Sequence, residues 1–116
     1  MTPYTYTIQG VPLTLTLRGQ SGAPHINLDL HAAPAPSALH PADACALADD
    51  IDHGRDRFLV TACASVISWC AARHTLTVLT PESGAATPTL ALPDRAEQTT
   101  LSCLLRLLNA RATCLS

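Results

Sequence analysis

The stretch that decides the fold is residues 4–18, which read YTYTIQGVPLTLTLR. Apolar and polar side chains alternate on both sides of Gln9 and Gly10, and a period of two residues is typical of a strand with one buried face. Pro12 has no backbone N–H to donate to a neighbouring strand, so it suits the start of the second strand. This stretch therefore predicts a β-hairpin with one apolar face.

A third alternating stretch follows a polar loop, at residues 26–31. Its Ile and Leu residues alternate with Asn, Asp and His, so the three stretches together predict an antiparallel meander. Residues 32–39 contain Pro34 and Pro36 and are interpreted as an extended linker. Because this linker is too short to separate domains, residues 1–116 are expected to form a single domain.

Two segments carry helix signals. Pro41 suits the first turn of a helix over residues 41–53, and Gly54 suits its end. Asp94 is a typical N-cap for a second helix, in which leucines recur at helical spacing. The apolar stripe of the first helix is narrow, so four of its aspartates are expected to face mostly outward: Asp43, Asp49, Asp50 and Asp52.

Residues 55–74 carry conflicting signals. Apolar residues recur on one helical face, yet many of the same residues are β-branched or aromatic types that strands favour. The length of the segment favours one long, central helix. Two further strands are expected at residues 76–79 and 89–92. The sequence thus predicts an α+β domain in the order βββ-α-α-ββ-α, with helices packed on one face of a mostly antiparallel sheet.

Composition and charge limit the class of partner. The formal net charge is −2 and aromatic residues make up 3%, so the sequence offers neither a basic stripe for phosphates nor a stacking platform for bases, and we expect no nucleic-acid partner. No apolar stretch suits a bilayer and no signal peptide is recognised, so we expect no membrane partner and a cytoplasmic location. Charged residues make up only 14%, which favours a surface partly covered by a second subunit or another protein.

The five cysteines form an odd set without a CxxC pair, which is typical of reduced thiols packed as small apolar residues. If the ambiguous segment is helical, Cys63, Cys70 and His74 lie along one line and suit a zinc site. Cys45, near the start of the first helix, is an alternative nucleophile. Neither spacing is specific, so we expect no metal, no cofactor and no catalytic residue. The alternative is a small Cys/His metal-binding regulator or a thiol enzyme.

Acidic residues gather near the end of the first predicted helix. The helix dipole disfavours carboxylates at a C-terminus, so this edge is expected to meet a partner that carries arginine. Four residues are expected to form the rim of that interface: Asp49, Asp52, Arg55 and Asp56.

No motif for phosphate binding, metal binding or nucleophilic catalysis is found in the sequence. The function we expect is therefore a non-catalytic, bacterial or phage protein-binding module that occupies a partner's surface. It would act as an inhibitor, an immunity or anti-defence protein, an adaptor, or a chaperone for one client. In topology alone the predicted order is loosely similar to small dimeric secretion chaperones, although those begin with a helix. The expected partner is another protein or a second copy of the chain.

Overall fold

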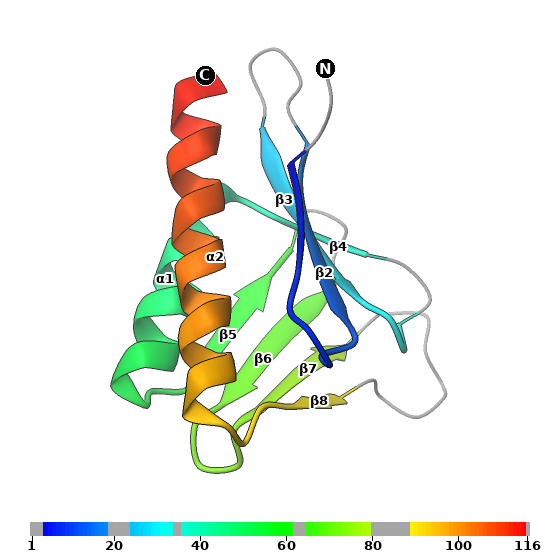
Figure 1. Cartoon of the computed structure of the whole chain (residues 1–116), viewed down its shortest axis with the longest axis vertical. Helices are drawn as coiled ribbons and strands as arrows, with labels where there is room; N and C mark the ends of the chain where they lie inside the picture. Colours follow the sequence, from blue (N-terminus) through cyan, green and yellow to red (C-terminus); the bar gives the residue numbers. More distant parts are fainter. Residues whose placement is uncertain (1–3, 19–23, 34–35, 62–64, 80–88, 116) are drawn as a thin grey trace.

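Two four-stranded antiparallel sheets and two helices make up the fold (Figure 1). The computed structural model describes residues 4–18, 24–33, 36–61, 65–79 and 89–115. The elements follow the order ββββ-α-ββββ-α, so each sheet is a meander followed by a helix. The predicted α+β class is therefore confirmed, with a different element order in the middle of the chain.

The first sheet has one apolar and one polar face, and it confirms the predicted meander. Its strands are β1 (Tyr4–Thr7), β2 (Leu13–Arg18), β3 (His25–Leu30) and β4 (Ser37–Leu39). Leu15 lies opposite Leu28 on the buried face, whereas Thr16 lies opposite Asn27 on the other face. The end of the predicted linker forms β4, because Leu39 is buried opposite Ile26.

Residues 55–74 contain a β-hairpin, so the prediction of one long helix is wrong. The hairpin consists of β5 (Arg57–Val60) and β6 (Val66–Cys70), which are antiparallel. Ile67 and Trp69 are buried, whereas Val66 and Ser68 lie on the opposite face. β-branched and aromatic side chains fit a pleated strand better than a helix, and here that preference outweighs the helical spacing.

The second sheet is completed by β7 (Thr75–Leu79) and β8 (Thr89–Ala91), which confirms the predicted second hairpin. The strand order is β5-β6-β7-β8, so β5 and β8 lie at the edges. Leu76, Val78 and Leu90 join Ile67 and Trp69 on the buried face.

The first helix begins and ends where the sequence predicts, and the second begins where the sequence predicts. In α1 (Pro41–His53), Nδ1 of His40 accepts a hydrogen bond from the Ala42 N–H over 3.2 Å. Gly54 follows in the left-handed conformation, with φ of 67°, which glycine adopts without steric cost. Before α2 (Arg95–Leu115), the Asp94 carboxylate accepts a hydrogen bond from the Ala96 N–H over 2.9 Å.

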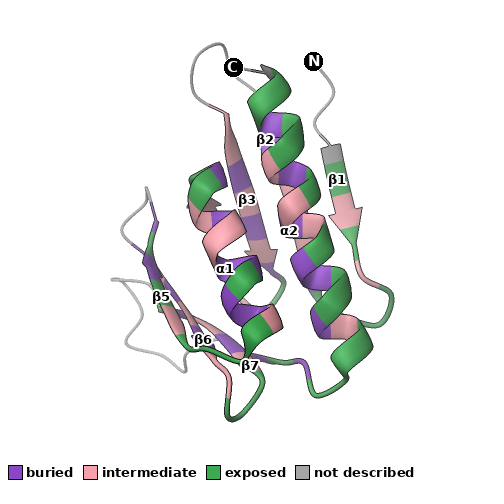
Figure 2. Cartoon of the chain, turned by 90° about the vertical axis from the view of Figure 1, so that its left-hand side faces the viewer, coloured by how far each residue is buried: buried purple, intermediate pink, exposed green. Residues whose placement is uncertain are grey.

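The helices lie side by side and bury their apolar stripes against each other and the sheets (Figures 1 and 2). α2 packs against β2 and β3, whereas α1 packs against β3 and β5. The core between them is almost entirely excluded from solvent, and its larger helical members are Leu47, Ile51, Leu101, Leu105 and Leu108. Neither helix, over its described residues, has the length and apolar character that crossing a bilayer requires.

The hairpin register can be tested by comparing two neighbouring residues of β6. We expect Ile67→Ala to lower the free energy of unfolding by about 2–5 kcal/mol, because it empties a fully buried site. Ser68→Ala, on the outer face, should change it by less than about 0.5 kcal/mol. Urea denaturation measures both values, and equal losses would contradict the register.

Candidate functional site

Exposed apolar side chains gather on the outer face of the second sheet. Four large apolar side chains are exposed among the described residues, and three belong to this sheet: Phe58 (69%), Val60 (72%) and Leu79 (42%). The fourth, Leu107, lies on α2 and is 38% exposed. Antiparallel sheets with one solvated face usually carry polar side chains there, so this face departs from the common pattern.

The strand register brings these side chains together. Val60 lies opposite Val66, and Val66 lies opposite Leu79, so three apolar side chains form a line across β5, β6 and β7. Phe58 points to the same face, two residues from Val60 along β5. We call these four residues, Phe58, Val60, Val66 and Leu79, the outer apolar row. A hydroxyl side chain borders it, because Phe58 lies opposite Ser68.

The outer apolar row reaches the edge of the sheet. Among the described residues β5 pairs only with β6, so its other side is an edge. Natural sheets usually protect such edges with proline, lysine or a bulge, and residues 57–60 offer only Arg57. Next to the far end of β5, the hydroxyls of Thr61 and Ser65 hydrogen-bond each other over 2.6 Å, and Ser37 of β4 hydrogen-bonds Ser65 over 3.0 Å. This contact joins the two sheets.

A buried carboxylate holds the start of β5 against α1. The Asp50 side chain is only 5% exposed and accepts hydrogen bonds from Nε of Arg57 and from Nε of Arg55, the latter over 2.8 Å. Burial raises the pKa of Asp50, but the hydrogen bonds from both arginines outweigh it, so the pKa lies below the ordinary 3.8. The prediction that Asp50 faces outward is therefore wrong, because two arginines beyond the helix balance its charge.

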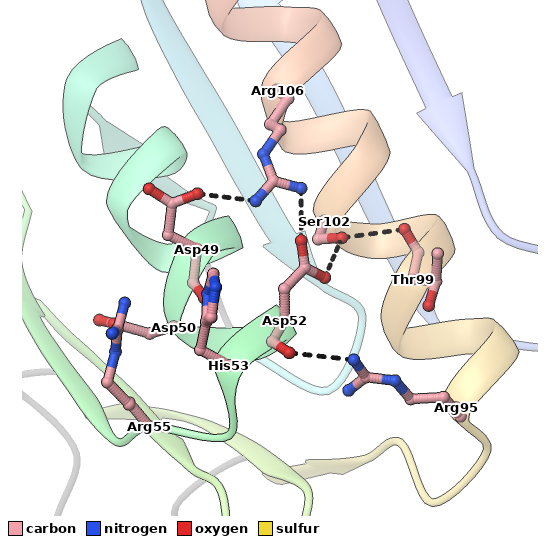
Figure 3. Close-up of polar contacts among 9 residues, drawn as sticks. All are labelled: Asp49, Asp50, Asp52, His53, Arg55, Arg95, Thr99, Ser102 and Arg106. Carbon is pink, nitrogen blue, oxygen red and sulfur yellow. Dashed lines mark hydrogen bonds and ion pairs between the residues drawn. The ribbon is translucent and has the colours of Figure 1, made fainter.

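The predicted interface residues Asp49 and Asp52 lie in the seam between the helices (Figure 3). Arg106 of α2 donates to Asp49 over 2.7 Å and to Asp52 over 2.5 Å. Asp52 also accepts a hydrogen bond from the Ser102 hydroxyl over 2.7 Å. The expected arginine partner of these carboxylates thus exists within the chain itself.

The seam shifts the pKa of its charged groups. Burial raises the pKa of Asp52, but hydrogen bonds from Ser102 and Arg106 lower it more, so the net shift is downward from 3.8. The two carboxylates raise the pKa of Arg106. Asp52 and Arg106 therefore stay charged at neutral pH, and their ion pair joins α1 to α2.

The other two predicted interface residues lie at the start of β5. The Arg55 side chain is 60% exposed although it bonds Asp50. The Asp56 carboxylate accepts a hydrogen bond from the Ala71 N–H over 2.8 Å, which holds the β6–β7 turn against this end of the sheet. Arg55 and Asp56 thus border the second sheet, whereas Asp49 and Asp52 lie between the helices.

The described residues do not form the helix on which the predicted zinc site depends. Cys63 lies outside the described residues, Cys70 ends β6 opposite Thr75, and His74 lies in the turn that follows. The helix that would have aligned them is absent from residues 57–61 and 65–70, which form strands or adjoin them. Within the described part of the chain no group of three or more His, Cys, Asp or Glu side chains is placed to hold a metal ion.

None of the four residues of the outer apolar row is among the site residues predicted from the sequence. Phe58 and Val60 are two residues apart, a spacing that signals a shared face only once the segment is known to be a strand. Interpreted as helical, the same residues merge into the general apolar character of the segment. Comparison of the chain with protein-family models, with curated proteins and with solved structures finds no match.

The acid dependence of stability tests the buried carboxylates. Because the pKa values of Asp50 and Asp52 are lower in the folded than in the unfolded chain, the stability they contribute is present above about pH 4 and is lost as the pH falls through the folded values. Asp52→Asn should lower the free energy of unfolding at neutral pH by about 1–3 kcal/mol and make its fall toward pH ~2.5 shallower. The control is Asp29→Asn, on the polar face of the first sheet, which should change the free energy of unfolding at neutral pH by less than about 0.5 kcal/mol. A slope unaltered by Asp52→Asn would contradict the assignment.

Proposed function

We propose that the chain is a non-catalytic protein-binding module that occupies a partner's surface with the outer face of its second sheet. The observation that carries this proposal is that, of the four large apolar side chains exposed in the described part of the chain, three cluster on that one face. The largest contiguous apolar patch on the surface of a soluble monomer is often functional. Burying them against a partner would contribute roughly 25 cal/mol per Å².

The surroundings of the outer apolar row also support binding. Its neighbours Ser68 and Thr77 are uncharged and hydroxyl-bearing, and Thr89 hydrogen-bonds Thr77 over 3.3 Å. An apolar centre with a polar border, from which charges are depleted, is the usual composition of a protein–protein interface. Of the four residues first expected at an interface, Arg55 and Asp56 remain candidates for its rim. Asp49 and Asp52 already bind Arg106.

The proposal also covers the location and the partner. Cys103 and Cys114 are exposed free thiols, which suits a reducing compartment such as the cytoplasm. The partner we propose is another protein, and a second copy of the chain is the alternative. An inhibitor, an immunity or anti-defence protein, an adaptor and a secretion-chaperone-like protein would all act in this way.

Photo-crosslinking from the second sheet tests the proposal. With p-benzoylphenylalanine in place of Phe58, irradiation of the protein in its own cells should give one discrete adduct, because this side chain would contact the partner. The matched control carries the same group at Thr16, on the outer face of the first sheet, and should give none. Val60→Asp should abolish the adduct while changing the free energy of unfolding by less than about 0.5 kcal/mol, since Val60 is exposed.

Mass spectrometry of the adduct identifies the partner. A second protein supports the proposal as stated, and an adduct of twice the chain's mass makes a second copy the partner. The proposal is overturned if position 58 gives no adduct, or if position 16 gives the same one.

A further inference from the structure

We propose that the partner enters as an extended segment that pairs with the outer edge of β5 and adds a fifth strand to the second sheet. This inference rests on the proposed function and adds the form of the occupant. It is supported by the area of the outer apolar row, by the edge of β5 and by the charge at one end of that edge.

The exposed area favours a narrow occupant. Phe58, Val60 and Leu79 together offer on the order of a few hundred Å² of exposed apolar surface. A stable interface with a folded partner or a second copy buries about 800 Å² on each side. A single added strand derives much of its affinity from main-chain hydrogen bonds and needs only a few side-chain contacts. The outer apolar row is therefore the right size for a strand and too small for a flat dimer.

The edge of β5 offers those main-chain hydrogen bonds. In an antiparallel pair, the N–H and C=O groups of alternate residues point toward the partner strand and the others point away. Among the described residues, no backbone hydrogen bond joins Phe58, Leu59 or Val60 to any element other than β6. The outward side chains of an added strand would lie about 5 Å from Phe58 and Val60, which is the distance of cross-strand pairs.

The charge at the start of β5 indicates which sequence the added strand should have. Arg55 and Arg57 are balanced there by the carboxylates of Asp50 and Asp56, so the positive charge in excess at this end is that of Arg73. Arg73 is exposed in the β6–β7 turn, which Asp56 holds against the same end of the sheet. The opposite end carries the uncharged Val60, Val66 and Leu79. The complementary segment therefore has apolar residues at alternate positions and carboxylates at the end that lies beside Arg55.

Synthetic peptides test strand addition directly. The probe is a fluorescein-labelled peptide of alternating valine and threonine with two glutamates at its N-terminal end, together with a second peptide that has them at the C-terminal end, because the strand direction is open. Two matched controls replace the glutamates with lysine, or a central threonine with proline, which removes a main-chain donor. Fluorescence anisotropy should show one glutamate peptide binding at least about tenfold more tightly than either control.

Hydrogen exchange and variants locate the bound peptide. The bound glutamate peptide should slow amide exchange in residues 57–60 and leave β1, β4 and β8, the other edge strands, unchanged. Val60→Asp should weaken binding about tenfold, whereas Thr5→Asp on edge strand β1 should not. Both substitutions are at exposed sites, so an unchanged unfolding midpoint shows that the fold is intact.

The outcomes separate this inference from the proposed function. If the peptides fail to bind while the crosslink from position 58 persists, strand addition is wrong and the binding face stands. If the peptides protect β1, β4 or β8 as much as β5, the binding is nonspecific and the inference is overturned. Slowed exchange in β5 that depends on the concentration of the chain alone would instead identify edge-to-edge pairing of two copies. If neither peptide nor crosslink is seen, both proposals fail.

Discussion

The contact between α1 and α2 is the constraint on which the rest of the structure depends, because it interlocks the two halves of the chain. The order ββββα occurs twice, yet each helix packs beyond its own sheet. α2 follows the second sheet and covers β2 and β3, whereas α1 follows the first sheet and reaches β5. Leu105 and Leu108 are therefore buried only when both halves are folded. Cooperative folding of the chain follows from this arrangement.

Ion pairs fix the position of one helix relative to the other in this apolar contact. Leucines alone would allow the helices to slide past each other, since burial of apolar area is nondirectional. Arg106 binds two carboxylates one helical turn apart, Asp49 and Asp52, and the Ser102 hydroxyl binds the second of them. Asp50, between them in sequence, points to the opposite side and binds the start of β5. Three neighbouring aspartates thus set the position of α1 against both α2 and the second sheet.

The parts of the fold that were predictable from the sequence are those in which one face is apolar and the other polar. The first sheet meets this condition, and Pro41, Gly54 and Asp94 mark helix boundaries. Residues 57–70 do not meet it, because Phe58, Val60 and Val66 are apolar on the side opposite Ile67. The side chains that obscured the period of two are the ones that form the candidate site. The roles of the aspartates were equally hidden, because Arg106 lies more than fifty residues away in sequence.

One buried side chain of the second sheet gives this fold a spectroscopic consequence. Trp69 is the only tryptophan in the chain, is 1% exposed, and lies opposite Arg57 of β5. Its indole N–H is the one buried side-chain polar group without a hydrogen-bond partner among the described residues. An excited indole in such surroundings has few mobile dipoles to relax around it, so it emits at the short-wavelength end of the tryptophan range. The tryptophan fluorescence of the chain is therefore a label-free signal from the second sheet, in which β6 lies between β5 and β7.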